Sequence, residues 1–211
     1  MKTTINIKTS EFKYNEYLVV LNANEDTSAK IIDIKKAFSV KYKIAPVYLQ
    51  PQIMLLNFIQ FEMVEERFLN HLKNISNGCT DFLVKLKDYG SFPTHTIFIN
   101  VESKQQIQNF VTKLKSVQRL ITPDKENKPH FMDDFYFPIG RKLLPWQYEK
   151  AWLEYSHLHF TAGFIADGFT LLKRPLESSA NGFEPKGSYK VLQHFRFFNS
   201  PVITTQGELF I

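Results

Sequence analysis

The sequence predicts an α+β fold in which two antiparallel sheets, with helices on their outer sides, surround a central cleft. Three observations support this prediction. Short apolar runs typical of strands are mixed with amphipathic segments typical of helices. The connections between neighbouring strands are short and turn-like, which favours hairpins over the long crossovers of a parallel sheet. The order strand, helix and strand pair occurs twice, so we expect residues 1–211 to form a single bilobal domain with two pseudo-symmetric lobes.

The first half of the chain contains two helical and four strand-like segments. Asp26 and Thr27 are favourable N-caps for the first helix, in which Ile31, Phe38 and Tyr42 recur at helical spacing. A turn at residues 90–93 joins the last two strands. The predicted elements are a strand at 17–23, a helix at 26–42, a strand at 52–61, a helix at 64–75, and strands at 81–89 and 95–101.

The second half repeats this order after one further helix. Ser103 and Gln106 have the spacing of a capping box at the start of that helix, and Pro145 suits the first turn of the next one. The aromatic residues of the Pro145 helix are expected to pack it onto a sheet, with base stacking as the alternative. The predicted elements are a helix at 103–117, a polar loop at 122–129, a strand at 134–143, a helix from 145, a strand at 160–174, a loop at 178–188 and a strand at 189–198.

The composition is that of an ordinary globular protein, with 44% hydrophobic and 22% charged residues. A net charge of +5 is compatible with a polyanionic partner such as RNA. The single cysteine, Cys79, excludes an intramolecular disulfide and a multi-cysteine zinc site and favours a reducing, cytoplasmic location. No segment approaches the roughly 20 apolar residues of a membrane span, so we expect no membrane partner.

Two of the predicted strands carry similar short patterns. The strand near residues 50–60 contains Pro-Gln-Ile-Met-Leu at 51–55, and the strand at 134–143 contains Phe-Tyr-Phe-Pro-Ile at 135–139. Together with the segments around them, these patterns resemble the two-histidine (2H) phosphoesterase superfamily, which includes the bacterial RNA 2',5'-ligases and the 2',3'-cyclic phosphodiesterases. That family places a His-x-Thr/Ser motif on each of two facing strands, usually written Pro-His-hydrophobic-Thr-hydrophobic. The resemblance covers nearly the whole chain and implies a bilobal fold with one motif in each lobe.

The family's chemistry needs two proton-transfer groups. Opening a 2',3'-cyclic phosphate, or reversing that step in ligation, requires one group to accept a proton and another to donate one. Histidine suits both roles because its pKa of about 6.5 leaves both forms available near neutral pH. The Thr or Ser two residues further on lies on the same face of the strand, where its hydroxyl can hold a phosphate oxygen. The resemblance implies no metal and no cofactor.

All four motif positions of this chain depart from that pattern. Gln52 and Tyr136 occupy the histidine positions, and Met54 and Pro138 occupy the hydroxyl positions. An amide cannot exchange a proton at neutral pH, and a phenol with a pKa of about 10 is a poor base. Each general acid–base group typically contributes about 10²- to 10⁴-fold to a rate, so ordinary two-histidine catalysis is not expected. We expect the four side chains to face the cleft without acting as catalysts.

Several other residues are candidates for contacts with a ligand. Arg141 and Lys142 follow the second motif strand directly, where similar family members also carry basic residues, and His95 lies in the strand pair beside the expected cleft. His159 begins a His-x-Thr sequence but is expected at a strand end. His130, Asp133 and Asp134 lack a coherent spacing for metal ligands and are expected in a solvated loop. The ligand-binding candidates are therefore Gln52, Tyr136, Arg141, Lys142 and His95.

The sequence thus favours a catalytically degenerate relative of the 2H phosphoesterases. We expect it to bind a nucleotide, an RNA end or another phosphorylated ligand in its cleft. One alternative is an active cyclic phosphodiesterase or RNA ligase that uses a relocated histidine, either His95 or His159. Another alternative is an interaction or scaffold protein with an empty apolar cleft. The pattern predicts neither the oligomeric state nor a protein partner.

Overall fold

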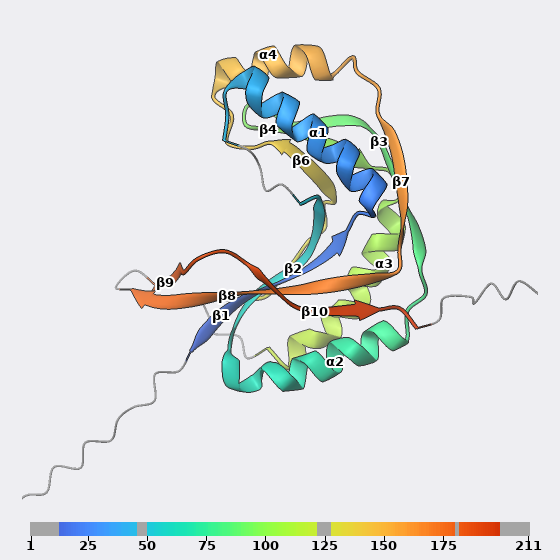
Figure 1. Cartoon of the computed structure of the whole chain (residues 1–211). Coiled ribbons are helices and arrows are strands. Elements are labelled where there is room, and N and C mark those ends of the chain that lie inside the picture. The colour runs from blue at the N-terminus through green and yellow to red at the C-terminus, as the bar shows by residue number, and fades with distance from the viewer. Residues whose placement is uncertain (1–12, 46–49, 122–127, 180–181, 199–211) are drawn as a thin grey trace, which may run out of the picture.

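A computed structural model describes residues 13–45, 50–121, 128–179 and 182–198, which form two antiparallel sheets and four α-helices (Figure 1). The predicted α+β class is confirmed. The larger sheet, sheet A, has the order β10-β8-β1-β2-β5, with β9 paired to β8. Its strands are β1 (Tyr14–Asn22), β2 (Gln52–Phe61), β5 (His130–Phe131), β8 (Gly168–Ser179), β9 (Gly182–Pro185) and β10 (Lys190–Arg196).

The smaller sheet, sheet B, has the order β6-β4-β3-β7. Its strands are β3 (Phe82–Phe92), β4 (Thr96–Val101), β6 (Tyr136–Gly140) and β7 (Thr161–Ala166). Strand β6 is therefore an edge strand, and Pro138 lies in it beside a register shift in its pairing with β4. A residue without an N–H is tolerated at such a position because the sheet requires no regular ladder hydrogen bond from it.

The helices divide between the two sheets. Helices α1 (Glu25–Tyr42) and α4 (Pro145–Tyr155) pack on sheet B, whereas α2 (Glu65–Asn77) and α3 (Lys104–Leu114) pack together against sheet A (Figure 1). Short 3-10 segments, Glu62–Val64 and Lys115–Arg119, precede α2 and follow α3. Helix α1 is notable because it connects β1 and β2 of sheet A but packs on β6 and β7 of sheet B.

One apolar core joins both sheets to their helices. It contains side chains of β1, β2 and α2 from one side and of β4, β6 and α4 from the other. Strand β2 shows how the core face is chosen, because Ile53, Leu55, Leu56 and Phe58 are all fully buried. Leu55 has no partner on β1 where the register between β1 and β2 shifts, so a β-bulge allows adjacent residues to point into the core. Among the described residues, no helix packs on the opposite face of sheet A.

The halves of the sequence do not correspond to the two sheets. Strands β1 and β2 lie in sheet A, but β3 and β4 from the same half lie in sheet B. The single strand predicted at 160–174 is two strands, β7 in sheet B and β8 in sheet A, separated at Asp167. Gly168 permits this change of sheet, because a Cβ there would collide with the backbone of Phe195. The two pseudo-symmetric lobes predicted for residues 1–211 remain a prediction.

Three local predictions need correction. The first helix is capped by Asn24, whose Oδ1 accepts a hydrogen bond from the Thr27 backbone N–H at 3.1 Å. Ser103 makes no capping hydrogen bond to α3; its hydroxyl accepts one from the Lys85 backbone N–H instead. The turn predicted at 90–93 is narrower, because β3 continues through Phe92.

Other predictions concern segments that the structure describes only in part. The predicted loop at 178–188 contains β9, and residues 180–181 lie outside the described residues. Residues 122–127 of the predicted polar loop also lie outside them. Among the helices of the described residues, none is long and apolar enough to cross a membrane.

The aromatic helix α4 packs as predicted along one side only. Tyr155 is buried and contacts Tyr89 with its ring edge at a centroid distance of 4.9 Å. The Tyr148 hydroxyl lies 2.9 Å from the Ser91 hydroxyl. Trp146 is more than half exposed. None of these side chains lines the large cavity described below.

Candidate functional site

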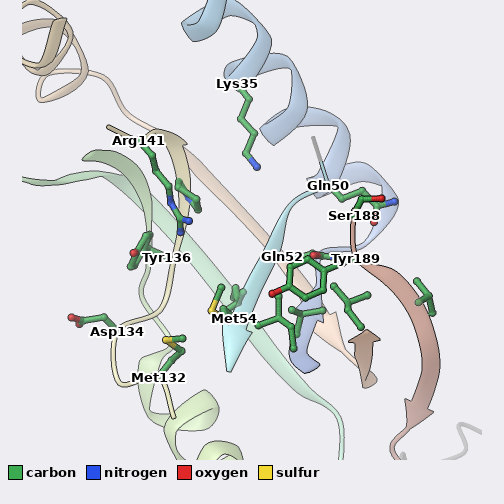
Figure 2. Close-up of a pocket in the computed structure, with 16 residues that line it drawn as sticks. Lys35, Gln50, Gln52, Met54, Met132, Asp134, Tyr136, Arg141, Ser188 and Tyr189 are labelled. Carbon is green, nitrogen blue, oxygen red and sulfur yellow. The ribbon is translucent and has the colours of Figure 1, made fainter. Parts of the chain in front are cut away.

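A cavity of about 430 Å³ lies where β2 of sheet A faces the edge strand β6 of sheet B (Figure 2). Both sheets, helix α1 and the loop before β10 contribute to its walls. Its size falls within the range typical of small-molecule sites. The lining residues are Leu18, Val20, Lys35, Gln50, Gln52, Ile53, Met54, Met132, Asp134, Tyr136, Pro138, Arg141, Leu172, Ser188, Tyr189 and Val191.

All four residues that the sequence comparison predicts at motif positions line this cavity. Gln52 and Met54 lie two residues apart on β2, and Tyr136 and Pro138 lie two residues apart on β6. Alternate residues of a strand share a face, so each pair lines the cavity together, whereas Phe137 and Ile139 of β6 are buried in the core. The two motif segments, far apart in sequence, therefore meet around one space.

Gln52 belongs to a row of hydrogen bonds that crosses four strands of sheet A. Its Nε2 donates to Asn22 Oδ1 at 3.0 Å, and Asn22 Nδ2 donates to Thr170 Oγ1 at 2.5 Å. Thr170 Oγ1 in turn lies 2.7 Å from His194 Nδ1. We call Gln52, Asn22, Thr170 and His194 the polar row. It fixes the Gln52 amide at the mouth of the cavity, since each member holds the next.

His194 and Thr170 were not among the residues selected from the sequence. Their meeting depends on the register of β8 with β1 and β10, where Thr170 pairs with Val20 on one side and His194 on the other. No local pattern in the sequence encodes that register. The available signal was limited to alternation: Thr170 and Leu172 share the face of β8 that lines the cavity side.

Tyr136 lies in a different setting from Gln52. Its ring packs against Phe98 at a centroid distance of 4.7 Å and meets Phe92 edge-on at 5.1 Å. The Arg141 guanidinium lies 5.9 Å from the centre of the same ring, within the range of a cation–π contact. Aromatic packing therefore holds Tyr136 in place, and it also holds Arg141 close to the cavity wall.

Lys35 is the main cavity residue that the sequence prediction missed. It lies on α1 four residues after Ile31, on the buried face of the helix, and only 2% of its surface is exposed. Burial, with a smaller contribution from the positive charge of Arg141, lowers the pKa of Lys35 to about 8. Figure 2 shows Lys35 and Arg141 both directed toward the cavity from the same end. A lysine on the apolar stripe of a helix was the signal for this position.

The remaining ligand-binding candidates lie elsewhere. Lys142, next to Arg141, has a positive φ of 53° and does not line the cavity. His95 does not line it either: its Nδ1 lies 2.6 Å from the hydroxyl of Thr96. Of the five candidates, the structure thus brings Gln52, Tyr136 and Arg141 together and leaves His95 and Lys142 outside.

The other histidine and acidic positions also have defined places. His159 is 90% exposed at its side chain, and its Nδ1 lies 3.2 Å from Asp88 Oδ1, on sheet B and away from the cavity lining. His130 is in the short strand β5 rather than in a loop. Asp134 lines the cavity, although its carboxylate points away from the space between Lys35 and Arg141 (Figure 2). Within the described ranges, no group of three or more His, Cys, Asp or Glu side chains is placed to hold a metal ion.

Fold and site together define an α+β protein with two antiparallel sheets and a cavity between motif-bearing strands. No family model matches the sequence, and no curated protein matches it. Among solved structures, this chain is similar to E. coli LigT, crystallised in complex with 3'-AMP, with a TM-score of 0.47 and 11% sequence identity. The match covers 88% of this chain and 98% of that one.

Proposed function

We propose that this protein is a catalytically silent relative of the 2H phosphoesterases that binds a phosphorylated ligand, such as a nucleotide or an RNA end, in the cavity between β2 and β6. The observation that carries the proposal is the convergence of the four motif positions on one cavity that also holds Lys35 and Arg141. The sequence resemblance supplies the ligand class. The two cationic side chains of the lining support the choice of an anionic ligand.

The positive charges support binding of an anion. Lys35 and Arg141 enter from the same end of the cavity, whereas Asp134 turns its carboxylate away from them (Figure 2). Arginine presents a planar fork of donors that matches phosphate oxygens, and a buried ammonium adds a point charge in a region of low dielectric. Gln52 adds an amide at the opposite strand. A phosphate group at this end of the cavity would be attracted by both cations at once.

The two histidines that turnover in the 2H family requires are missing from the described lining of the cavity. None of those lining residues is a histidine. His95 and His159, the two candidates for a relocated motif, both lie outside it, in the segments before β4 and β7, and contact side chains of sheet B. Without the pair of histidines, the protein is expected to bind a cyclic phosphate without opening it.

The proposal is tested by calorimetric titration of the full chain with 3'-AMP and with 2',3'-cyclic AMP. Arg141→Gln is expected to weaken binding by about tenfold or more, since a hydrogen bond to a charged group contributes roughly 1.5–3 kcal/mol. Lys142→Gln is the matched control, because it removes the same charge one residue away and outside the cavity. Equal losses in both variants would contradict a specific role for the cavity.

A turnover assay separates this proposal from its alternatives. Incubation with 2',3'-cyclic AMP is expected to yield no product above the buffer control. Hydrolysis that disappears in His95→Ala or His159→Ala would support an active enzyme instead. Absence of binding to every phosphorylated probe would favour an interaction or scaffold protein.

A further inference from the structure

The cavity has an aliphatic wall that the motif comparison does not explain. It is formed by Leu18 and Val20 of β1, Met54 of β2, Leu172 of β8 and Val191 of β10, all on the side of sheet A that faces away from α2 and α3. We call these five residues the aliphatic wall. They come from four neighbouring strands, so the wall is a continuous patch of the sheet rather than a set of isolated side chains.

The wall is separate from the main core of the protein. Leu18, Val20 and Leu172 form a buried cluster of their own, against which Met54 and Tyr189 pack. Helices α2 and α3 pack on the other side of sheet A, and the space above the wall is the cavity itself. Apolar side chains that border a cavity gain free energy when a ligand displaces the water there.

The chemistry of the wall differs from that of the opposite end. Lys35 and Arg141 place positive charge at one end of the cavity (Figure 2). The five side chains of the wall, in contrast, include no N–H or O–H group. Sugar hydroxyls buried against such a surface would lose hydrogen bonds to water without replacement, which costs free energy. An apolar group makes no hydrogen bonds to water, so its burial there carries no such cost. Charge and apolar surface therefore select a ligand with an anionic head and an apolar body.

We propose that the cavity binds an alkyl or aryl phosphate ester, with the phosphoryl group between Lys35 and Arg141 and the apolar body on the aliphatic wall. This inference rests on the proposed function for its anion and narrows the class of ligand. Met54 has a clear part in it: at the position where the 2H family carries a hydroxyl, this chain extends the wall. The substitution exchanges a phosphate contact for an apolar one.

The test is a calorimetric series with inorganic phosphate, ethyl phosphate, butyl phosphate, hexyl phosphate and 3'-AMP on the full chain. Affinity is expected to rise by roughly two- to fourfold for each added methylene, as expected for burial of alkyl surface. Hexyl phosphate is therefore expected to bind more tightly than 3'-AMP. Phosphate esters whose affinity does not change with chain length, or a preference for 3'-AMP, would overturn the inference and leave the proposed function standing.

A pair of methionine variants locates the effect. Met54→Gln keeps the length of the side chain but adds polar atoms to the wall, so it should reduce the gain per methylene and weaken hexyl phosphate binding by about threefold to tenfold. Met63→Gln is the matched control, because Met63 is 74% exposed and outside the cavity. An unchanged series in Met54→Gln would overturn the assignment to this wall. If no phosphate compound binds the unmodified protein, the proposed function fails and this inference fails with it.

Discussion

The two motif strands border the same cavity, but they hold their motif positions by different forces. On β2, Gln52 is fixed by hydrogen bonds that run through Asn22 to Thr170 and His194. On β6, Tyr136 is fixed by ring contacts with Phe92 and Phe98 and by the guanidinium of Arg141. One side of the site is thus a polar network, and the other is an aromatic cluster.

This difference shows that the two walls of the cavity are held in place in different ways. A hydrogen-bonded row contributes direction and only modest stability, because each bond replaces one with water. An aromatic cluster stabilises the fold mainly through burial and ring packing, which contribute more free energy per side chain. The β6 position should therefore matter more for folding, whereas the β2 position should matter more for orienting a ligand. Four substitutions test this comparison.

The largest effect is expected from Tyr136→Ala. Removal of the ring leaves Phe92 and Phe98 without their partner and should lower the free energy of unfolding by about 2–4 kcal/mol. Urea denaturation followed by circular dichroism measures this change. Tyr136→Phe is the control, because it keeps the ring and should cost less than about 1 kcal/mol. Similar losses in both variants would show that the hydroxyl, rather than the ring, holds this side of the site.

Lys35→Met is expected to increase stability at pH 7, by about 1–3 kcal/mol, because a buried charged amine is costly and methionine retains the apolar stem. The pKa of Lys35 is about 8 in the folded protein against 10.5 for an ordinary lysine. The folded state therefore bears the full cost of the charge below pH 8, and that cost is relieved as pH rises from 8 toward 10.5. The advantage of the variant should shrink over the same interval.

Urea denaturation of both proteins at several pH values checks this dependence. Lys36→Met is the matched control on the same helix, since Lys36 is exposed. A stability difference that stays constant from neutral pH to well above the folded pKa would mean that the Lys35 amine does not titrate in this interval.

Thr170→Val is expected to have an intermediate effect, a loss of about 1–2 kcal/mol, because it removes the central hydroxyl of the polar row and leaves Asn22 Nδ2 without its acceptor. Thermal unfolding of the variant measures it. The ¹H–¹⁵N spectrum of the Gln52 side-chain amide provides a second readout, because that amide depends on the row for its orientation. An unshifted Gln52 signal would contradict the coupling.

The smallest effect is expected from Gln52→Ala. Gln52 lies at the partly exposed end of the row, where its hydrogen bond to Asn22 exchanges readily with water, so the loss should stay below about 1 kcal/mol. The same variant should nevertheless weaken binding of a phosphorylated probe. A stability loss as large as that of Tyr136→Ala would remove the contrast between the two strands.

The sequence predicted the parts of the site that depend on local periodicity. Alternation along a strand was sufficient to place Gln52 with Met54 and Tyr136 with Pro138 on shared faces. Alternation does not predict the register between strands that are far apart in sequence. The pairing of Thr170 on β8 with His194 on β10 was therefore not predicted. Lys35 was missed for another reason: helical spacing places it on the same stripe as Ile31 and Phe38, but spacing alone does not show that a cavity lies beside that stripe.

The sequence prediction also missed the point at which the chain passes from one sheet to the other. The run from 160 to 174 was predicted as one strand, although the Asp167-Gly168 pair is a turn dipeptide and stands where the chain moves from sheet B to sheet A. Gly168 allows the chain to pass close to the backbone of Phe195 at this point, where a Cβ would collide. Ser103 illustrates the same limit, because Lys85 on a neighbouring strand of the fold competes successfully for its hydroxyl.

The path of helix α1 has a consequence for how the molecule loses its structure. The helix is tethered at both ends to strands of sheet A, while its buried face lies on sheet B. Unfolding of either sheet would disturb the other, because α1 is connected through the chain to sheet A and packs on sheet B. We therefore expect that neither sheet unfolds independently of the other when the protein is heated or exposed to denaturant. The chain should unfold in a single cooperative transition.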